Sequence, residues 1–129
     1  MEHKIFNKKI LFIILIGLIL RVAFILYLKP EFYFDDEHEY WKMVENFLSG
    51  NGLIVGENLK AYRPPLYPLF LILLTKAGVG IVGIRMLQGL ISAATIYLIY
   101  YLGSKIYNER VGTLAAGIAS IYPFFIFYS

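Results

Sequence analysis

The sequence predicts an all-α membrane protein with three transmembrane helices and an outer loop that carries two interfacial helices. Hydrophobic residues make up 59% of the chain, whereas soluble domains contain about 45–50%. Apolar runs of membrane-crossing length occur at 10–28, 81–104 and 111–128. Lys and Arg residues flank these runs where cytoplasmic ends are expected. Together these observations place the chain in the membrane class.

Composition also excludes several kinds of site and partner. The chain has no Cys and only two His, so neither a disulfide framework nor a thiolate metal site is expected. The net charge of +3 follows from the basic flanks of membrane helices. We therefore expect no nucleic-acid partner.

The first span, 10–28, is expected to leave the cytoplasm. Lys8 and Lys9 precede it, and the positive-inside rule then places the N-terminus inside. A cleaved signal peptide is the alternative, but small residues do not mark a cleavage site at its end. Arg21 lies inside the run. It either snorkels to the outer interface or faces a polar cavity between helices.

The outer loop, about 29–80, contains two apolar-faced segments. Residues 36–48 show hydrophobic residues at helical spacing and polar residues elsewhere, as in a helix lying on a membrane surface. The Gly and Asn residues of 49–52 are expected to end it. The apolar part of 66–77 is too short to cross, which favours an interfacial or re-entrant helix.

The last two spans, 81–104 and 111–128, are joined by a short basic turn. If 66–77 does not cross, Lys105 and Arg110 in that turn are cytoplasmic, as the positive-inside rule prefers. We expect this multi-pass chain to be the N-terminal part of a longer protein in the cell membrane. A naturally short membrane protein is the alternative.

Asp36 and Glu37 are the candidate catalytic residues. They stand near the outer mouth of the first span, where carboxylates are costly unless they are solvated or paired. Such a carboxylate can accept a proton from an attacking hydroxyl or bind a divalent metal ion. The alternative is a capping box formed by Asp36 and Glu39. No cofactor is certain from the sequence.

Arg63 is the candidate phosphate contact. Pro64 and Pro65 stiffen the chain after it, and a guanidinium suits bidentate contact with phosphate. Lipid head groups are the less specific partner. Lys60, Lys76 and Arg85 add positive charge on the same predicted outer side.

The acidic motif at 36–40, "DEHEY", and the later motif at 63–68, "RPPLYP", together resemble the N-terminal part of GT-C fold glycosyltransferases. The chain is most similar to the dolichyl-phosphate-mannose–protein mannosyltransferase-like and aminoarabinose-transferase-like enzymes. The resemblance extends over nearly the whole chain and is carried by the pairing of the two motifs. Arg at position 63, where aminoarabinose-type relatives often have Lys, favours the protein-mannosyltransferase side.

The resemblance implies a function and a set of roles. Such enzymes move a sugar, with inversion, from a polyprenyl-phosphate carrier to a protein, lipid or glycan acceptor on the extracytoplasmic face. Asp36 then corresponds to the base or acceptor-positioning group, Glu37 to its neighbour, and Arg63 to the contact with the carrier phosphate. Tyr40 and Arg85 complete the candidate substrate-binding set.

Two other functions remain open from the sequence. The chain could be a non-catalytic membrane subunit whose outer loop binds a partner, or a fragment of a transporter for the lipid carrier. The family's second acidic site and later helices follow the third span, and the chain ends before them. We therefore expect this segment to be inactive by itself.

Overall fold

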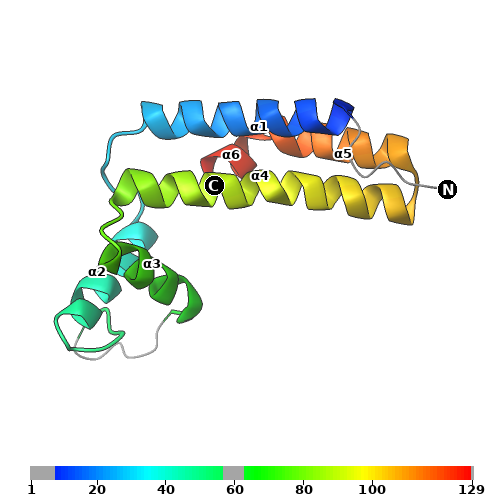
Figure 1. Ribbon diagram of the computed structural model, residues 1–129. Helices are drawn as coiled ribbons and strands as arrows, with labels where there is room; N and C mark the ends of the chain where they lie inside the picture. The colour runs from blue at the N-terminus through cyan, green and yellow to red at the C-terminus, as the bar shows by residue number, and fades with distance from the viewer. Residues whose placement is uncertain (1–7, 57–62, 129) are drawn as a thin grey trace. The chain divides into compact units, whose positions relative to one another are not determined.

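The computed structural model describes residues 8–56 and 63–128 and bears out the all-α prediction (Figure 1). The described residues form six helices: α1 (Lys8–Tyr27), α2 (Asp35–Leu48), α3 (Leu66–Lys76), α4 (Ile81–Ile106), α5 (Glu109–Ile121) and α6 (Pro123–Phe127). They divide into two compact units, which we describe separately. One is a helical bundle of Met1–Leu28 and Arg85–Ser129, and the other is the loop unit Lys29–Ile84.

Helices α1 and α4 are each long and apolar enough to cross a membrane. The 20 residues of α1 correspond to about 30 Å of helix, which matches the hydrocarbon thickness of a bilayer. The 26 residues of α4 exceed that thickness. Helix α3 has only 11 residues and is too short to cross, as its sequence predicted.

The third predicted span, 111–128, is two helices rather than one. Helix α5 ends at Ile121, and α6 starts at Pro123. Tyr122 between them is extended, with φ −66° and ψ 120°. Proline has no N–H for the helical ladder and disfavours helical angles in the residue before it, which explains the break. Whether α5 and α6 together cross the membrane stays a prediction.

Small residues let the bundle helices approach closely. Ile10 of α1, Ile96 of α4 and Ala116 of α5 form a buried core. A Cβ on Gly103 of α4 would lie 2.9 Å from the Cα of Gly112 of α5. Backbone contact of this kind is typical of helix pairs in membranes, where tight van der Waals packing replaces the hydrophobic effect.

The loop unit has its own small core between α2 and α3. Val44 of α2 packs with Leu71 and Ile72 of α3 and with Ile84. The apolar face of α2, predicted to lie on the membrane, thus packs largely against α3. Helix α2 ends at Leu48, and Gly50 and Gly52 follow with φ of 86° and 84°, so the predicted left-handed turn is confirmed.

Candidate functional site

Arg63 is bound by two carboxylates of α2. Its Nε donates a hydrogen bond of 2.9 Å to Oε2 of Glu39, and its Nη2 donates one of 2.6 Å to the same oxygen. Nη2 also donates to Oδ1 of Asp36. The two motifs singled out in the sequence, separated by more than twenty residues, therefore meet through one guanidinium.

The register of α2 places these groups together. Glu39 and Tyr40 lie three and four residues after Asp36 within the helix, and residues at these spacings share one face. Three acids, Asp35, Asp36 and Glu37, occupy the first turn, where the positive end of the helix dipole favours them. Because α2 packs against α3 through Val44 and its neighbours, this face lies beside the chain that enters α3.

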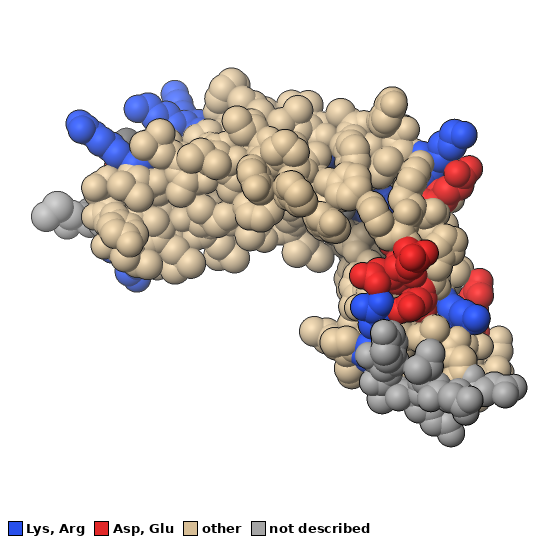
Figure 2. Space-filling view, turned by 180° about the vertical axis from the view of Figure 1, so that it is seen from behind, with Lys and Arg blue, Asp and Glu red and all other residues tan. Residues whose placement is uncertain are grey.

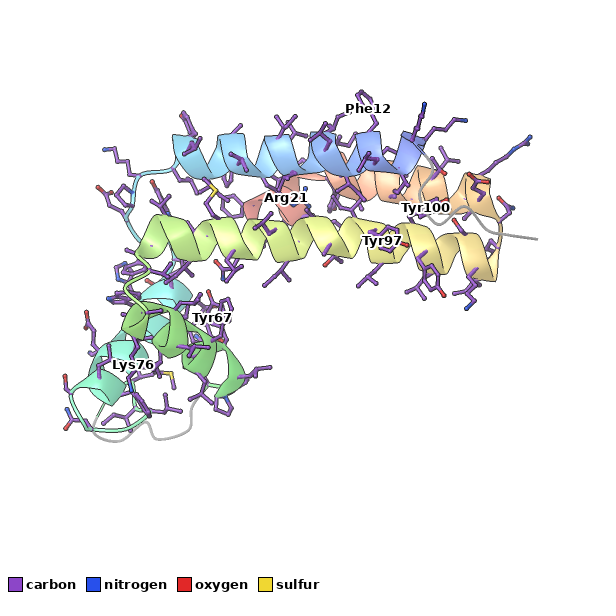
Figure 3. All side chains as sticks on the ribbon, viewed as in Figure 1. Phe12, Arg21, Tyr67, Lys76, Tyr97 and Tyr100 are labelled. Atoms are coloured by element: carbon purple, nitrogen blue, oxygen red, sulfur yellow. The ribbon has the colours of Figure 1, made fainter. Side chains whose placement is uncertain are left out.

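An aromatic surface supports the guanidinium. The Cζ atom of Arg63 lies 5.5 Å from the centroid of the Tyr40 ring, within the range of a cation–π contact. The Tyr67 ring meets Tyr40 edge-on, with centroids 4.8 Å apart. Tyr67 projects from α3 (Figure 3), so both helices contribute to holding Arg63 in place.

The electrostatics of the group are acidic overall. The hydrogen bond to Glu39 is the largest cause that raises the pKa of the Arg63 guanidinium, and Asp36 adds to it. Arg63 is therefore always charged. Two carboxylates face it, so the three groups carry a net charge of about −1. Figure 2 shows acidic and basic side chains gathered in this unit.

The two carboxylates differ in exposure. The side chain of Asp36 is 66% exposed, against 32% for Glu39 and 25% for Arg63. Asp36 makes one of the three hydrogen bonds described above, and Glu39 makes two. Glu39 is thus the anchor of the guanidinium, and Asp36 is the partner that a ligand can replace more readily.

The capping-box alternative for Asp36 and Glu39 is wrong. Helix α2 starts at Asp35, its N-cap is Phe34, and no side chain caps it. Glu37 instead accepts a hydrogen bond of 2.7 Å from the backbone N–H of Tyr33. Glu39 was not predicted as a contact of Arg63, although its spacing of three from Asp36 places it on the same helical face.

For two other sequence candidates, a part in this group stays a prediction. Arg85 lies in the bundle unit, buried to 8% exposure, so its predicted substrate contact stays a prediction. Lys60 lies outside the described residues. Across 8–56 and 63–128, no cluster of three His, Asp or Glu side chains is arranged to hold a metal ion.

Comparison with known proteins adds one finding. The sequence profile described as dolichyl-phosphate-mannose-protein mannosyltransferase matches residues 62–129, more than half of the chain. The matched range includes Arg63, while Asp36 and Glu39 lie outside it. No curated protein and no solved structure matches the chain.

Proposed function

The chain belongs to the dolichyl-phosphate-mannose-protein mannosyltransferase family, and we propose that it carries part of the active site of a glycosyltransferase. The enzyme moves a sugar from a polyprenyl-phosphate carrier to a hydroxyl on the extracytoplasmic face, with inversion. Asp36 is the catalytic carboxylate, with Glu37 beside it. Arg63 receives the carrier phosphate, and Tyr40 supports it; Arg85 is a further candidate contact for the substrate.

Arg63 fits the leaving-group side of this reaction. As the bond between the sugar C1 and the phosphate oxygen breaks, the electron pair stays on the phosphate, which becomes more negative. A fixed cation beside that oxygen stabilises the transition state more than the ground state. The permanent charge of Arg63 and its anchoring by Glu39 provide such a cation.

Asp36 fits the acceptor side. The acceptor hydroxyl attacks C1 opposite the departing phosphate, and its proton passes to the Asp36 carboxylate. In the structure that carboxylate is bound to Arg63. A donor phosphate that takes the place of Asp36 on Nη2 would free Asp36 for the proton and leave Glu39 to hold the guanidinium. Binding of the donor and release of the base are then one event.

The observation that carries the proposal is the contact of Arg63 with Asp36 in a chain of this family. We expect Asp36→Asn in the complete gene product to lower kcat for sugar transfer about 10²- to 10⁴-fold, the usual contribution of a general base. The measurement is transfer of radiolabelled sugar from a polyprenyl-phosphate donor in isolated membranes. Asp35→Asn removes the same charge one residue earlier and serves as the control.

The outcomes separate the proposed enzyme from its alternatives. Transfer by the wild type that Asp36→Asn leaves unchanged would remove Asp36 from the catalytic role. A wild type that binds the donor lipid without transferring its sugar, while moving it between leaflets, would favour the transporter. Neither transfer nor movement would favour a non-catalytic subunit.

A further inference from the structure

Arg21 is a buried cation in the bundle unit, away from the group around Arg63 in the sequence. It is 1% exposed and is the largest fully buried side chain among the described residues. The snorkelling alternative is therefore wrong, because the side chain extends into the bundle, between the helices, rather than out to an interface (Figure 3). The cavity alternative, in contrast, matches a feature of the structure.

Four neutral oxygens fix the guanidinium of Arg21. Nε donates to Oγ of Ser92 at 2.9 Å, and Nη1 donates to the carbonyls of Gly17 at 2.9 Å and Ser120 at 3.2 Å. Nη2 has one long contact, 3.4 Å to the carbonyl of Phe125. Nη2 is thus the guanidinium nitrogen of Arg21 with the weakest hydrogen bonding.

Among residues 8–56 and 63–128, the partners that the structure gives the positive charge of Arg21 include no carboxylate. Arg63, which does pair with carboxylates, belongs to the loop unit. Glu109, the one acid in the described part of the bundle, stands at the start of α5, whereas Ser120 near its end contacts Arg21. An uncompensated charge inside a membrane bundle is costly, and such residues pair with a counter-charge or line a functional cavity.

A cavity of about 130 Å³ lies against Arg21. Its lining includes the hydroxyl residues Ser92 and Thr95 and apolar groups of Ile96, Ile99 and Phe125. The Ser92 hydroxyl accepts from Arg21, and a hydroxyl that accepts can still donate its own proton. Nη2 of Arg21 and the Ser92 hydroxyl therefore supply hydrogen-bond donors to a cavity whose lining is otherwise largely apolar.

We propose that this cavity binds the phosphate group of a membrane lipid, with the phosphate on Arg21 and Ser92 and hydrocarbon along the apolar wall. A phosphate oxygen suits guanidinium and hydroxyl donors and supplies the missing negative charge. Arg21 is six residues, or about 9 Å, from the end of α1 at Tyr27. A lipid phosphate therefore reaches it from the nearer interface without crossing the hydrocarbon core.

The test is lipid binding to the purified chain in detergent, independent of any transferase assay. Native mass spectrometry compares the binding of dioleoyl phosphatidic acid, dioleoylglycerol and inorganic phosphate. The comparison distinguishes the contribution of the phosphate to affinity from that of the acyl chains. We expect phosphatidic acid to bind at least about tenfold more tightly than dioleoylglycerol, consistent with charged hydrogen bonds. Binding of inorganic phosphate equal to that of phosphatidic acid would overturn a lipid site in favour of a free-anion site.

Three single-residue variants test whether phosphatidic acid binds at Arg21 and Ser92. Arg21→Gln should reduce phosphatidic acid affinity about tenfold or more, and Arg110→Gln, which removes an exposed charge, should not. Ser92→Ala leaves Arg21 in place and should weaken phosphatidic acid binding several-fold. This second variant tests the proposal even if Arg21→Gln does not fold. Wild-type affinity in Ser92→Ala, or equal loss in Arg110→Gln, would refute the proposal.

Discussion

At the scale of single residues, Arg63 and Arg21 differ in their exposure and in the charge of their partners. Arg63 is partly exposed and has two carboxylates, so its neighbourhood is negative. Arg21 is buried, and its partners in the described part of the chain are neutral oxygens. Arg63 is therefore suited to exchanging a carboxylate for a ligand at a solvated surface. Arg21 is suited to a fixed position between packed helices.

Glu39 is expected to position Arg63. Glu39→Gln removes the charge that makes two of the hydrogen bonds to the guanidinium. Donor KM should rise about tenfold, with a smaller change in kcat, because the phosphate contact is less well fixed before the donor binds. Steady-state transfer assays at varied donor concentration measure the separate changes in KM and kcat.

Glu45→Gln is the matched control for Glu39. Glu45 is exposed on the same helix, and the substitution makes the same charge change. Equal donor KM in the two variants would show that Glu39 does not position Arg63.

At the scale of helices, α4 and α5 approach each other backbone to backbone at Gly112. A Cβ on Gly112 would meet the carbonyl oxygen of Tyr100 at 2.5 Å and the backbone nitrogen of Ser104 at 2.7 Å. These are backbone atoms of α4, so they cannot rotate away as a side chain can. The short turn to α5, capped by the Asn108 side chain on the N–H of Val111, fixes the register at which they meet.

Gly112→Ala should therefore destabilise the bundle by about 2 kcal/mol, as overpacking does in well-packed cores. Gly117→Ala on the same helix is the control, since a Cβ there meets nothing within 4 Å. Alanine at this position should be neutral or stabilising by up to about 1 kcal/mol, from helix propensity. Thermal unfolding in detergent compares them, and equal melting temperatures would contradict the contact.

At the scale of the whole molecule, basic residues gather at one end of the bundle. Helix α1 begins with Lys8 and Lys9 at the end where α4 finishes with Lys105, followed by Arg110 (Figures 1 and 2). This arrangement agrees with the topology predicted from the sequence, with that end in the cytoplasm.

The predicted topology can be tested directly because the chain has no native Cys. Single cysteines are placed at Asn51, in the loop after α2, and at Tyr107, exposed in the turn before α5. In intact cells a membrane-impermeant thiol reagent should label Asn51→Cys. Labelling of Tyr107→Cys should require permeabilised membranes, and the reverse pattern would overturn the orientation.

The sequence by itself determined the all-α membrane class, the length limit on α3 and the glycine turn after α2. These depend on local composition, on helix rise and on the backbone freedom of glycine, all of which are readable along the chain. It also singled out Asp36 and Arg63, because charged residues near a membrane are costly enough to stand out.

Only the tertiary structure decided which partners those charges have. Glu39 joined Arg63 because α2 packs against α3, and Arg21 turned inward because Ser92, Gly17, Ser120 and Phe125 offer oxygens to it from four helices. Such contacts join residues far apart in the chain, and no local pattern encodes their distance. The sequence predicted one span over 111–128. The break at Pro123, which leaves the carbonyls of Ser120 and Phe125 as acceptors for Arg21, appeared only in the structure.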